Sequence, residues 1–186
     1  MAKMLKAYDA DDFQEDGKKT REICFVRGVF SNFFKSIFIW NILLSSDGPT
    51  LGEKTFNCGE QAFHYAKAII FGDEETAQKI LNEPEPSKQK ELGRTVSNFN
   101  NEVWNNVSYF IMLQIQIAKF SQPGLYDILM DTGDANIIEG AYYDKQWGNG
   151  KSPNDTFEDN KPNGKNLLGK AIMEAREIIR RKAIQV

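Results

Sequence analysis

The sequence predicts an α+β fold, a mainly helical single domain with a small N-terminal β-sheet. Apolar residues recur at helical spacing after Gly59, whereas residues 22–28 and 37–44 are rich in β-branched and aromatic side chains. At 186 residues, with 41% hydrophobic and 26% charged residues, the chain is long enough to bury one core. We therefore expect one domain over residues 21–186, preceded by a loosely docked polar arm, residues 1–20.

The helices are predicted from the spacing of their apolar residues. Phe63, Ala66 and Ile70 fall at i, i+3 and i+7, the core stripe of a helix. Residues 101–120 are apolar nearly all round at their centre, which indicates a buried central helix. The predicted helices span residues 59–71, 74–82, 87–93, 101–120, 124–133 and 166–182. Residues 135–142, "ANIIEGAY", read as a further strand.

Two segments carry turn and loop signals. Residues 45–54, "SSDGPTLGEK", have the Gly and Pro content of turns. Residues 148–164 are rich in Gly, Asn, Asp and Pro and predict a long loop, which in a small domain is usually functional or mobile.

Composition excludes several classes of function. A net charge of −3 gives no general footprint for tracking nucleic acid, and no apolar run is long enough to span a bilayer. Cys24 and Cys58, without a dense cysteine framework or an N-terminal apolar segment, favour a reducing cytoplasm. One histidine cannot supply a structural zinc site, so we expect no metal and no cofactor, although a carboxylate Mg²⁺ site stays open.

One face of the first predicted helix is polar. Glu60, His64 and Lys67 lie at i, i+4 and i+7, opposite the apolar stripe. Such a face is most often solvated. If it faces a cleft instead, Glu60 becomes an acid or base and Lys67 an anion ligand.

The segment 137–150, "IIEGAYYDKQWGNG", combines carboxylates with flat rings. Glu139 and Asp144 bracket two tyrosines, and Trp147 precedes Gly148. Rings that stack on a heterocycle, beside acids that stabilise a cationic sugar carbon, suit glycoside cleavage. A purely structural aromatic corner is the alternative.

A partial phosphate-loop pattern occurs at residues 164–171, "GKNLLGKA". Ala171 stands where Ser or Thr should reach a metal, and no hydrophobic strand precedes the motif, so nucleotide triphosphate hydrolysis is disfavoured. Asn166 and the neighbouring glycines remain able to present N–H groups to a phosphate or polar ligand; an ordinary helix start is the alternative.

Seven segments in this order resemble the YbiA-like, or NADAR, family over about residues 23–181. They are "FSNFF" (30–34), "CGEQAFHYAKAIIFGD" (58–73), "LGRTV" (92–96), Trp104, "AKF" (118–120), "IIEGAYYDKQWGNG" (137–150) and "GKNLLGKAIMEAR" (164–176). The family has a mainly helical α+β fold. Its characterised members are N-glycosidases that cleave phosphoribosylamino-pyrimidine intermediates of riboflavin synthesis or remove ADP-ribose from modified guanine in nucleic acid.

The resemblance implies a set of site residues. Glu60, Asp144 and Glu139 match the family's acidic positions and are expected to be catalytic. The expected substrate-binding residues are Asn32, Phe33, Lys67, Arg94, Trp104, Tyr143, Trp147, Gly148 and Asn166. From the residues alone, Trp104 is most simply a core side chain and Arg94 a surface ion pair. The chain departs from its relatives in a longer, more apolar insert at 37–55 and in the aromatic residues between its acids.

These observations together predict an enzyme, a hydrolase that cleaves a ribose–nitrogen bond. The first substrate hypothesis is ADP-ribosylated guanine in nucleic acid, and the second is a phosphoribosylamino-pyrimidine. Either Glu60 or Asp144 would stabilise the sugar cation, and the other would hold or protonate the leaving nitrogen. A non-catalytic module that binds NAD or ADP-ribose is the alternative of a different class.

Overall fold

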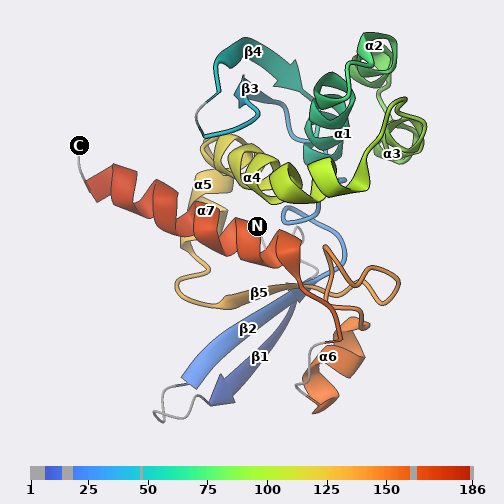
Figure 1. Cartoon of the computed structure of the whole chain (residues 1–186). Helices are drawn as coiled ribbons and strands as arrows, with labels where there is room; N and C mark the ends of the chain where they lie inside the picture. The colour runs from blue at the N-terminus through green and yellow to red at the C-terminus, as the bar shows by residue number, and fades with distance from the viewer. Residues whose placement is uncertain (1–6, 14–18, 47, 160–162, 185–186) are drawn as a thin grey trace. The chain divides into compact units, whose positions relative to one another are not determined.

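The computed structural model of the chain separates into two units, whose elements are labelled in Figure 1. Unit 1 comprises Met1–Ser31 and Pro123–Val186, and unit 2 comprises Asn32–Gln122. The structure describes residues 7–13, 19–46, 48–159 and 163–184. Helices and two small sheets give the α+β fold that the sequence predicts.

Unit 1 is built on a three-stranded sheet with the order β1-β2-β5. β1 (Ala7–Phe13) is antiparallel to β2 (Lys19–Phe25), and β5 (Asn136–Glu139) is parallel to β2, with Ile23 opposite Ile137. Burial of branched and aromatic side chains explains why these segments form strands. The buried apolar residues of β2 and β5 are Ile23, Cys24, Phe25 and Ile137.

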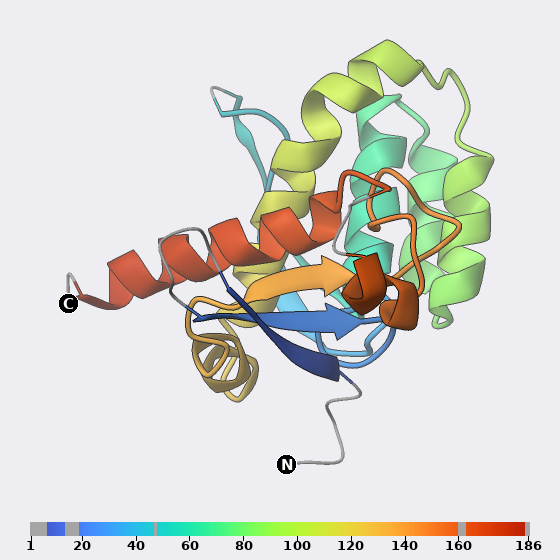
Figure 2. The same cartoon turned by 90° about the horizontal axis from the view of Figure 1, so that it is seen from below.

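The helices of unit 1 follow the sheet in the chain. They are α5 (Leu125–Met130), α6 (Pro153–Asp159) and α7 (Leu167–Ile184). Figure 2 shows β1, β2 and β5 side by side, with α7 running along β5, and α7 contacts β5 directly. α7 buries Leu168, Ile172, Ala175 and Ile179, whose helical spacing makes one apolar stripe.

A ladder of backbone hydrogen bonds joins the loop after β5 to the start of α7. The N–H groups of residues 165–168 donate to the carbonyl oxygens of residues 145–148, with N···O distances of 2.8–3.1 Å. Asn166 reinforces this loop–helix ladder: its Oδ1 accepts from the Glu139 N–H at 3.0 Å, and its Nδ2 donates to the Ile137 carbonyl at 2.9 Å. Asn166 has φ of +51°, a left-handed conformation that Asn tolerates better than most residues.

Unit 2 packs four helices with a two-stranded sheet. Its elements are β3 (Phe38–Leu43), β4 (Thr50–Phe56), α1 (Gly59–Ile70), α2 (Glu74–Asn82), α3 (Pro86–Arg94) and α4 (Asn101–Phe120). α1 contacts α2, α3 and α4, while β3 contacts α4. α1 is therefore the central helix of this unit by its contacts, alongside the long α4 that the sequence predicts as buried.

Side-chain caps fix where three of these helices begin. Cys58 Sγ accepts from the Gln61 N–H at the start of α1. Asp73 accepts from the N–H groups of Thr76 and Ser97, which ties the start of α2 to the segment before α4, and these bonds hold the pKa of Asp73 well below its usual value. The Asn100 side chain caps α4.

Two predicted irregular segments contain regular structure. The predicted loop 148–164 includes α6, because Pro153 suits the first helical turn and Ser152 Oγ accepts from the Asp155 N–H at 3.3 Å. The predicted turn 45–54 ends earlier than expected, since β4 begins at Thr50 and pairs with β3 as a hairpin.

Other boundaries also differ from the sequence prediction, most clearly in the N-terminal arm and at the third helix. Within the predicted arm 1–20, residues 7–13 form β1, and β2 begins at Lys19; the rest of the arm lies outside the described residues. The third helix begins at Pro86 rather than at residue 87, with Glu85 at the N-cap position and no side-chain cap bond. The two predicted N-terminal strands are both present, in separate sheets.

The role of Asn166 can be tested with two substitutions. We expect Asn166→Gly to lower the free energy of unfolding by about 1–3 kcal/mol, because two hydrogen bonds are lost. Asn166→Ala should lower it by a further 1–2 kcal/mol or so, because alanine is strained at positive φ. Urea unfolding measures both variants, with the exposed neighbour Lys165→Ala as control. If the glycine and alanine variants lose the same free energy of unfolding, the positive φ at position 166 does not strain alanine as argued.

Candidate functional site

The polar face of α1 is buried in the structure. Glu60 is 6% exposed and His64 is 8% exposed, and Lys67 is partly buried. The solvated alternative for this face is therefore wrong. A buried carboxylate must be paired or hydrogen-bonded to be tolerated, so its contacts define what the face can do.

Glu60 lies in a small polar cluster within unit 2. Its Oε1 is 3.1 Å from His64 Nε2 and 3.9 Å from Lys90 Nζ on α3. Its backbone N–H donates to the Asn32 carbonyl at 3.0 Å, which pins the start of α1 to the predicted "SNF" turn. We call Asn32, Glu60, His64 and Lys90 the Glu60 cluster. Its carboxylate faces two nitrogen groups, the His64 imidazole and the Lys90 ammonium.

Asn32 is held by α4 as well as by α1. Its Oδ1 accepts from Gln116 Nε2 at 2.9 Å, and its Nδ2 contacts the Met112 sulfur at 3.4 Å. A Cβ on Gly59 would lie 2.6 Å from Asn32 Oδ1, so only glycine fits there. The side-chain amide of Asn32 is thus committed to the scaffold around Glu60.

Phe33 and Trp104 have different environments. Phe33 is 40% exposed, and Lys90 Nζ lies 5.5 Å from its ring centroid, so Phe33 stands beside the Glu60 cluster. Trp104 is buried, with its ring 4.9 Å from that of Phe63. The structural reading of Trp104 as a core residue agrees with this packing.

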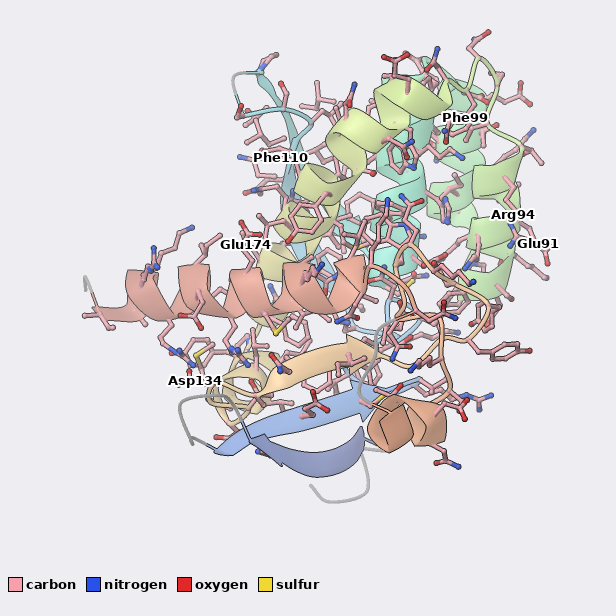
Figure 3. The ribbon with its side chains drawn as sticks, turned by 60° about the horizontal axis from the view of Figure 1, so that its bottom comes forward. Glu91, Arg94, Phe99, Phe110, Asp134 and Glu174 are labelled. Carbon is pink, nitrogen blue, oxygen red and sulfur yellow. The ribbon has the colours of Figure 1, made fainter. Side chains whose placement is uncertain are left out.

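Lys67 and Arg94 do not converge on Glu60. Lys67 Nζ donates to the Gly93 carbonyl at 2.8 Å and lies 4.1 Å from the Phe99 ring centroid. Burial lowers the pKa of Lys67. Arg94 is exposed, and Figure 3 shows it with Glu91 on the outer side of α3, so a ligand would have to reach it there.

In unit 1, Asp144 organises the aromatic loop. Its Oδ1 accepts from the N–H groups of Gln146 at 2.9 Å and Trp147 at 2.8 Å. The carboxylate is half-buried and has the geometry of an Asx turn. Together with the loop–helix ladder, this bond sets the position of Trp147.

The remaining loop residues fall into buried and exposed groups. A Cβ on Gly148 would lie 2.8 Å from the Ala141 side chain, so the loop closes tightly there. Glu139 and Trp147 are half-buried. Tyr143 is 72% exposed and packs edge-on against Tyr142, at 5.2 Å between ring centroids. Tyr143 is thus exposed to solvent, where its ring is accessible to a ligand.

The start of α7 does not offer free N–H groups at residues 165–168. All four are taken by the loop–helix ladder, and both polar atoms of the Asn166 side chain bind β5. A phosphate cannot take these groups while the ladder is intact. The ordinary helix start fits this segment better than a phosphate site.

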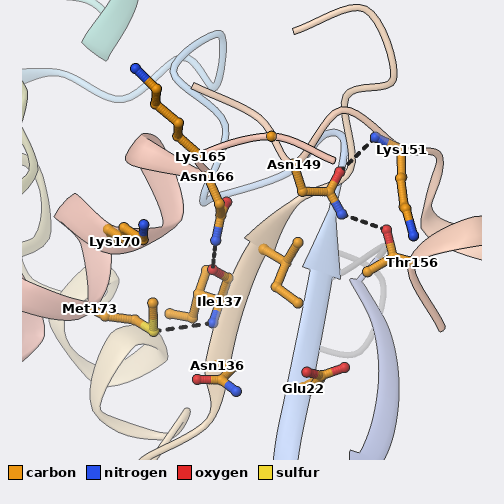
Figure 4. A pocket seen from close by; sticks show the side chains of 12 residues that line it. Glu22, Asn136, Ile137, Asn149, Lys151, Thr156, Lys165, Asn166, Lys170 and Met173 are labelled. Atoms are coloured by element: carbon orange, nitrogen blue, oxygen red, sulfur yellow. Dashed lines mark hydrogen bonds between the residues drawn. The ribbon is translucent and has the colours of Figure 1, made fainter. Parts of the chain in front are cut away.

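Unit 1 contains a groove of about 320 Å³ beside β2 and β5 (Figure 4). It lies between α7, which contributes Lys170 and Met173, and the α6 region, which contributes Thr156. Of the predicted site residues, Asn166 alone lines it. The other polar side chains of the groove are those of Glu22, Asn136, Asn149, Lys151 and Lys165. These residues are scattered along the chain, which left no local sequence signal.

Lys119 is a further buried group in unit 2. Its Nζ lies 5.9 Å from the Phe34 ring centroid and 5.0 Å from that of Phe120. Burial lowers the pKa of Lys119 to about 7, whereas burial raises the pKa of the Cys58 thiol to about 11. From the sequence, the position of Lys119 near the end of a helix predicts an interaction with the helix dipole. The spacing of apolar residues along the helix does not predict that Lys119 is fully buried.

The residues that the structure describes contain neither a side-chain cluster suited to a metal ion nor a helix suited to crossing a membrane. No group of three or more His, Cys, Asp or Glu side chains in this part of the chain is placed to hold a metal ion. Among the same residues, no helix combines the length and apolar character needed to cross a membrane.

The comparisons identify the family. The NADAR domain model matches residues 20–180, so the chain belongs to the NADAR domain family, as the motif order predicts. The chain is 40% identical over 121 residues to "N-glycosidase R617" of Acanthamoeba polyphaga mimivirus, which covers 63% of this chain and 71% of that protein. It is 35% identical over 158 residues to "Protein irg-1" of Caenorhabditis elegans, covering 80% of this chain and 74% of the relative.

Two further proteins match the chain at lower sequence identity. The "Riboflavin biosynthesis protein VVA0006" of Vibrio vulnificus is 27% identical over 127 residues, covering 68% of this chain and 32% of that protein. The NMR structure of the Escherichia coli protein YbiA matches with a TM-score of 0.66 at 27% identity, covering 88% of each chain. The fold class is thereby confirmed.

The buried ammonium of Lys119 predicts a pH dependence of stability. Between its folded pKa of about 7 and its ordinary value of 10.5, the unfolded chain binds a proton that the folded chain does not. The contribution of Lys119 to stability is therefore largest above pH 10.5, and it is lost as the pH falls toward 7. The free energy of unfolding should rise between pH 7 and about 8.5, below cysteine ionisation. In urea unfolding, Lys119→Met should flatten this rise, and the exposed Lys170→Met should keep it; equal slopes would contradict the assignment.

Proposed function

We propose that this chain is an N-glycosidase that hydrolyses the bond between a ribose and a nucleobase nitrogen. The observation that carries the proposal is the buried, hydrogen-bonded carboxylate of Glu60 on α1, in a family with a relative named as an N-glycosidase. A fixed carboxylate in a site with little water stabilises developing positive charge far better than one in bulk solvent.

The reaction needs one cation-stabilising group, one water and one proton for the leaving base. As the bond from C1′ to nitrogen breaks, its electrons go to the base, and positive charge spreads over C1′ and the ring oxygen. Water then adds to C1′, and one of its protons is released. The base gains a proton at its nitrogen, so atoms and charge balance. We propose Glu60, Asp144 and Glu139 as the acidic groups that serve these steps.

For the substrate we favour a nucleobase that carries ADP-ribose, with guanine first. Exposed Tyr143 and half-buried Trp147 are proposed to hold the base. Lys67 and Arg94 are proposed phosphate ligands. The second candidate, a phosphoribosylamino-pyrimidine, is favoured by the relative named for riboflavin biosynthesis.

We also propose that the protein acts in the cytoplasm. Cys24 and Cys58 are both buried free thiols, and burial raises the pKa of each to about 11. Such thiols are inert structural groups that suit a reducing compartment.

Neutral substitutions of the acids test the chemistry. Glu60→Gln and Asp144→Asn should each lower kcat by about 10²-fold or more, because the charge is lost while the shape is kept. Asparagine at position 144 can still accept the two loop N–H groups, so the Trp147 segment should stay in place. The exposed Glu174→Gln serves as control and should keep the wild-type rate.

The assay uses purified protein with two substrates in parallel. One is an oligonucleotide with ADP-ribosylated guanine, and the other is the ribosylaminopyrimidine phosphate; mass spectrometry reads the released sugar. ADP-ribose from the first alone supports the nucleobase assignment, and ribose 5-phosphate from the second alone selects the metabolite. If the protein binds ligand but releases no product, and both carboxylate variants bind equally well, the protein is a binding module rather than an enzyme.

A further inference from the structure

His64 is the single histidine of the chain, one helical turn after Glu60 on α1. The residue is 8% exposed, and its ring packs edge-on against Phe63 at 5.7 Å between centroids. The proposed chemistry does not use it directly. Its two ring nitrogens nevertheless have very different surroundings, and this difference fixes the state of the ring.

Nε2 has a partner, whereas Nδ1 has none among the described residues. Nε2 is 3.1 Å from Glu60 Oε1. Nδ1 is buried against the backbone of α3, where a Cβ on Gly93 would lie only 2.0 Å away. No space remains there for a water or a ligand. Lys67, one turn further along α1, donates to the carbonyl of the same Gly93 and holds α3 against the ring.

This environment selects one form of the imidazole. A proton on Nδ1 would be a buried N–H without an acceptor, which is costly. A proton on Nε2 is donated to the carboxylate, so the neutral Nε2–H tautomer satisfies the contact. Lys90 adds a positive charge at 3.9 Å from the same oxygen, and the other titratable groups nearby are Lys67 and the Cys58 thiol.

We infer that His64 is a positioning residue whose neutral Nε2–H form donates to Glu60 Oε1 and fixes the Glu60 side chain in place. The inference rests on the proposed function, and it assigns roles that the sequence leaves open. We assign to Glu60 the stabilisation of the sugar cation, because its Oε1 accepts a hydrogen bond from His64 and faces the Lys90 ammonium. Glu60 does not protonate the leaving nitrogen, and that task falls to another group.

The first test needs no substrate. Because the chain has one histidine, a ¹⁵N-labelled sample with a histidine-free tag gives one set of imidazole signals. Long-range ¹H–¹⁵N correlation spectra at pH 7 should show a neutral ring with the proton on Nε2. In Glu60→Gln the ring signals should shift, since the hydrogen-bond partner changes. A ring protonated on both nitrogens, or on Nδ1 alone, would overturn the inference.

The second test compares three variants on whichever substrate the wild type cleaves. His64→Gln keeps an N–H donor near the position of Nε2 and should retain most of the rate. His64→Leu removes the donor and should lower kcat about 10–100-fold with little change in KM, because Glu60 is no longer fixed in place. Gly93→Ala, which displaces the ring, should resemble His64→Leu.

Urea unfolding of each variant separates misfolding from a positioning effect. If His64→Leu stays folded and keeps the wild-type kcat, the inference fails although the protein is an enzyme. If the wild type cleaves neither substrate, the proposed function fails, and the tautomer spectrum still decides whether His64 donates to Glu60.

Discussion

The absence of a side chain at Gly93 is the constraint on which the candidate site in unit 2 depends. Because α3 has no Cβ there, its backbone can lie against the His64 ring and cover a polar face of α1. Burial then forces each polar group on that face to find a partner. Glu60 pairs with His64, and Lys67 takes the Gly93 carbonyl. A glycine on one helix thus decides the chemistry available on its neighbour.

The sequence predicts the helices and strands whose apolar residues have a strong periodicity. It does not predict the elements that depend on pairing with another segment or that lack such periodicity. The i, i+3, i+7 stripe of Phe63, Ala66 and Ile70 predicted α1 to within a residue or so. α6 was missed because its seven residues have too little apolar periodicity to be distinguished from a polar loop, and its Ser-Pro start was the available signal. β1 was missed because a charged strand is specified by its pairing with β2 rather than by its own composition.

The candidate residues were chosen by type, and the structure separates their roles by contact. Asn32 and Asn166 are both polar residues in family motifs, yet the side-chain amide of each is hydrogen-bonded to other groups of the protein. The full burial of Lys119 gave no sequence signal, since burial of a lysine follows from tertiary packing that spacing cannot encode. Sequence reasoning identifies side chains able to perform the chemistry, but the satisfaction of buried polar groups determines which ones remain available for it.

The two proposed carboxylates each have an oxygen already engaged by nitrogen groups of the protein. Glu60 faces an imidazole N–H and an ammonium, and Asp144 accepts two backbone N–H groups. These contacts fix each carboxylate in place within its own part of the fold. We therefore assign the proton that the leaving nitrogen needs to a different group. Glu139 or a water molecule is the better source, and such a division favours substrates whose base leaves readily once the sugar cation is stabilised.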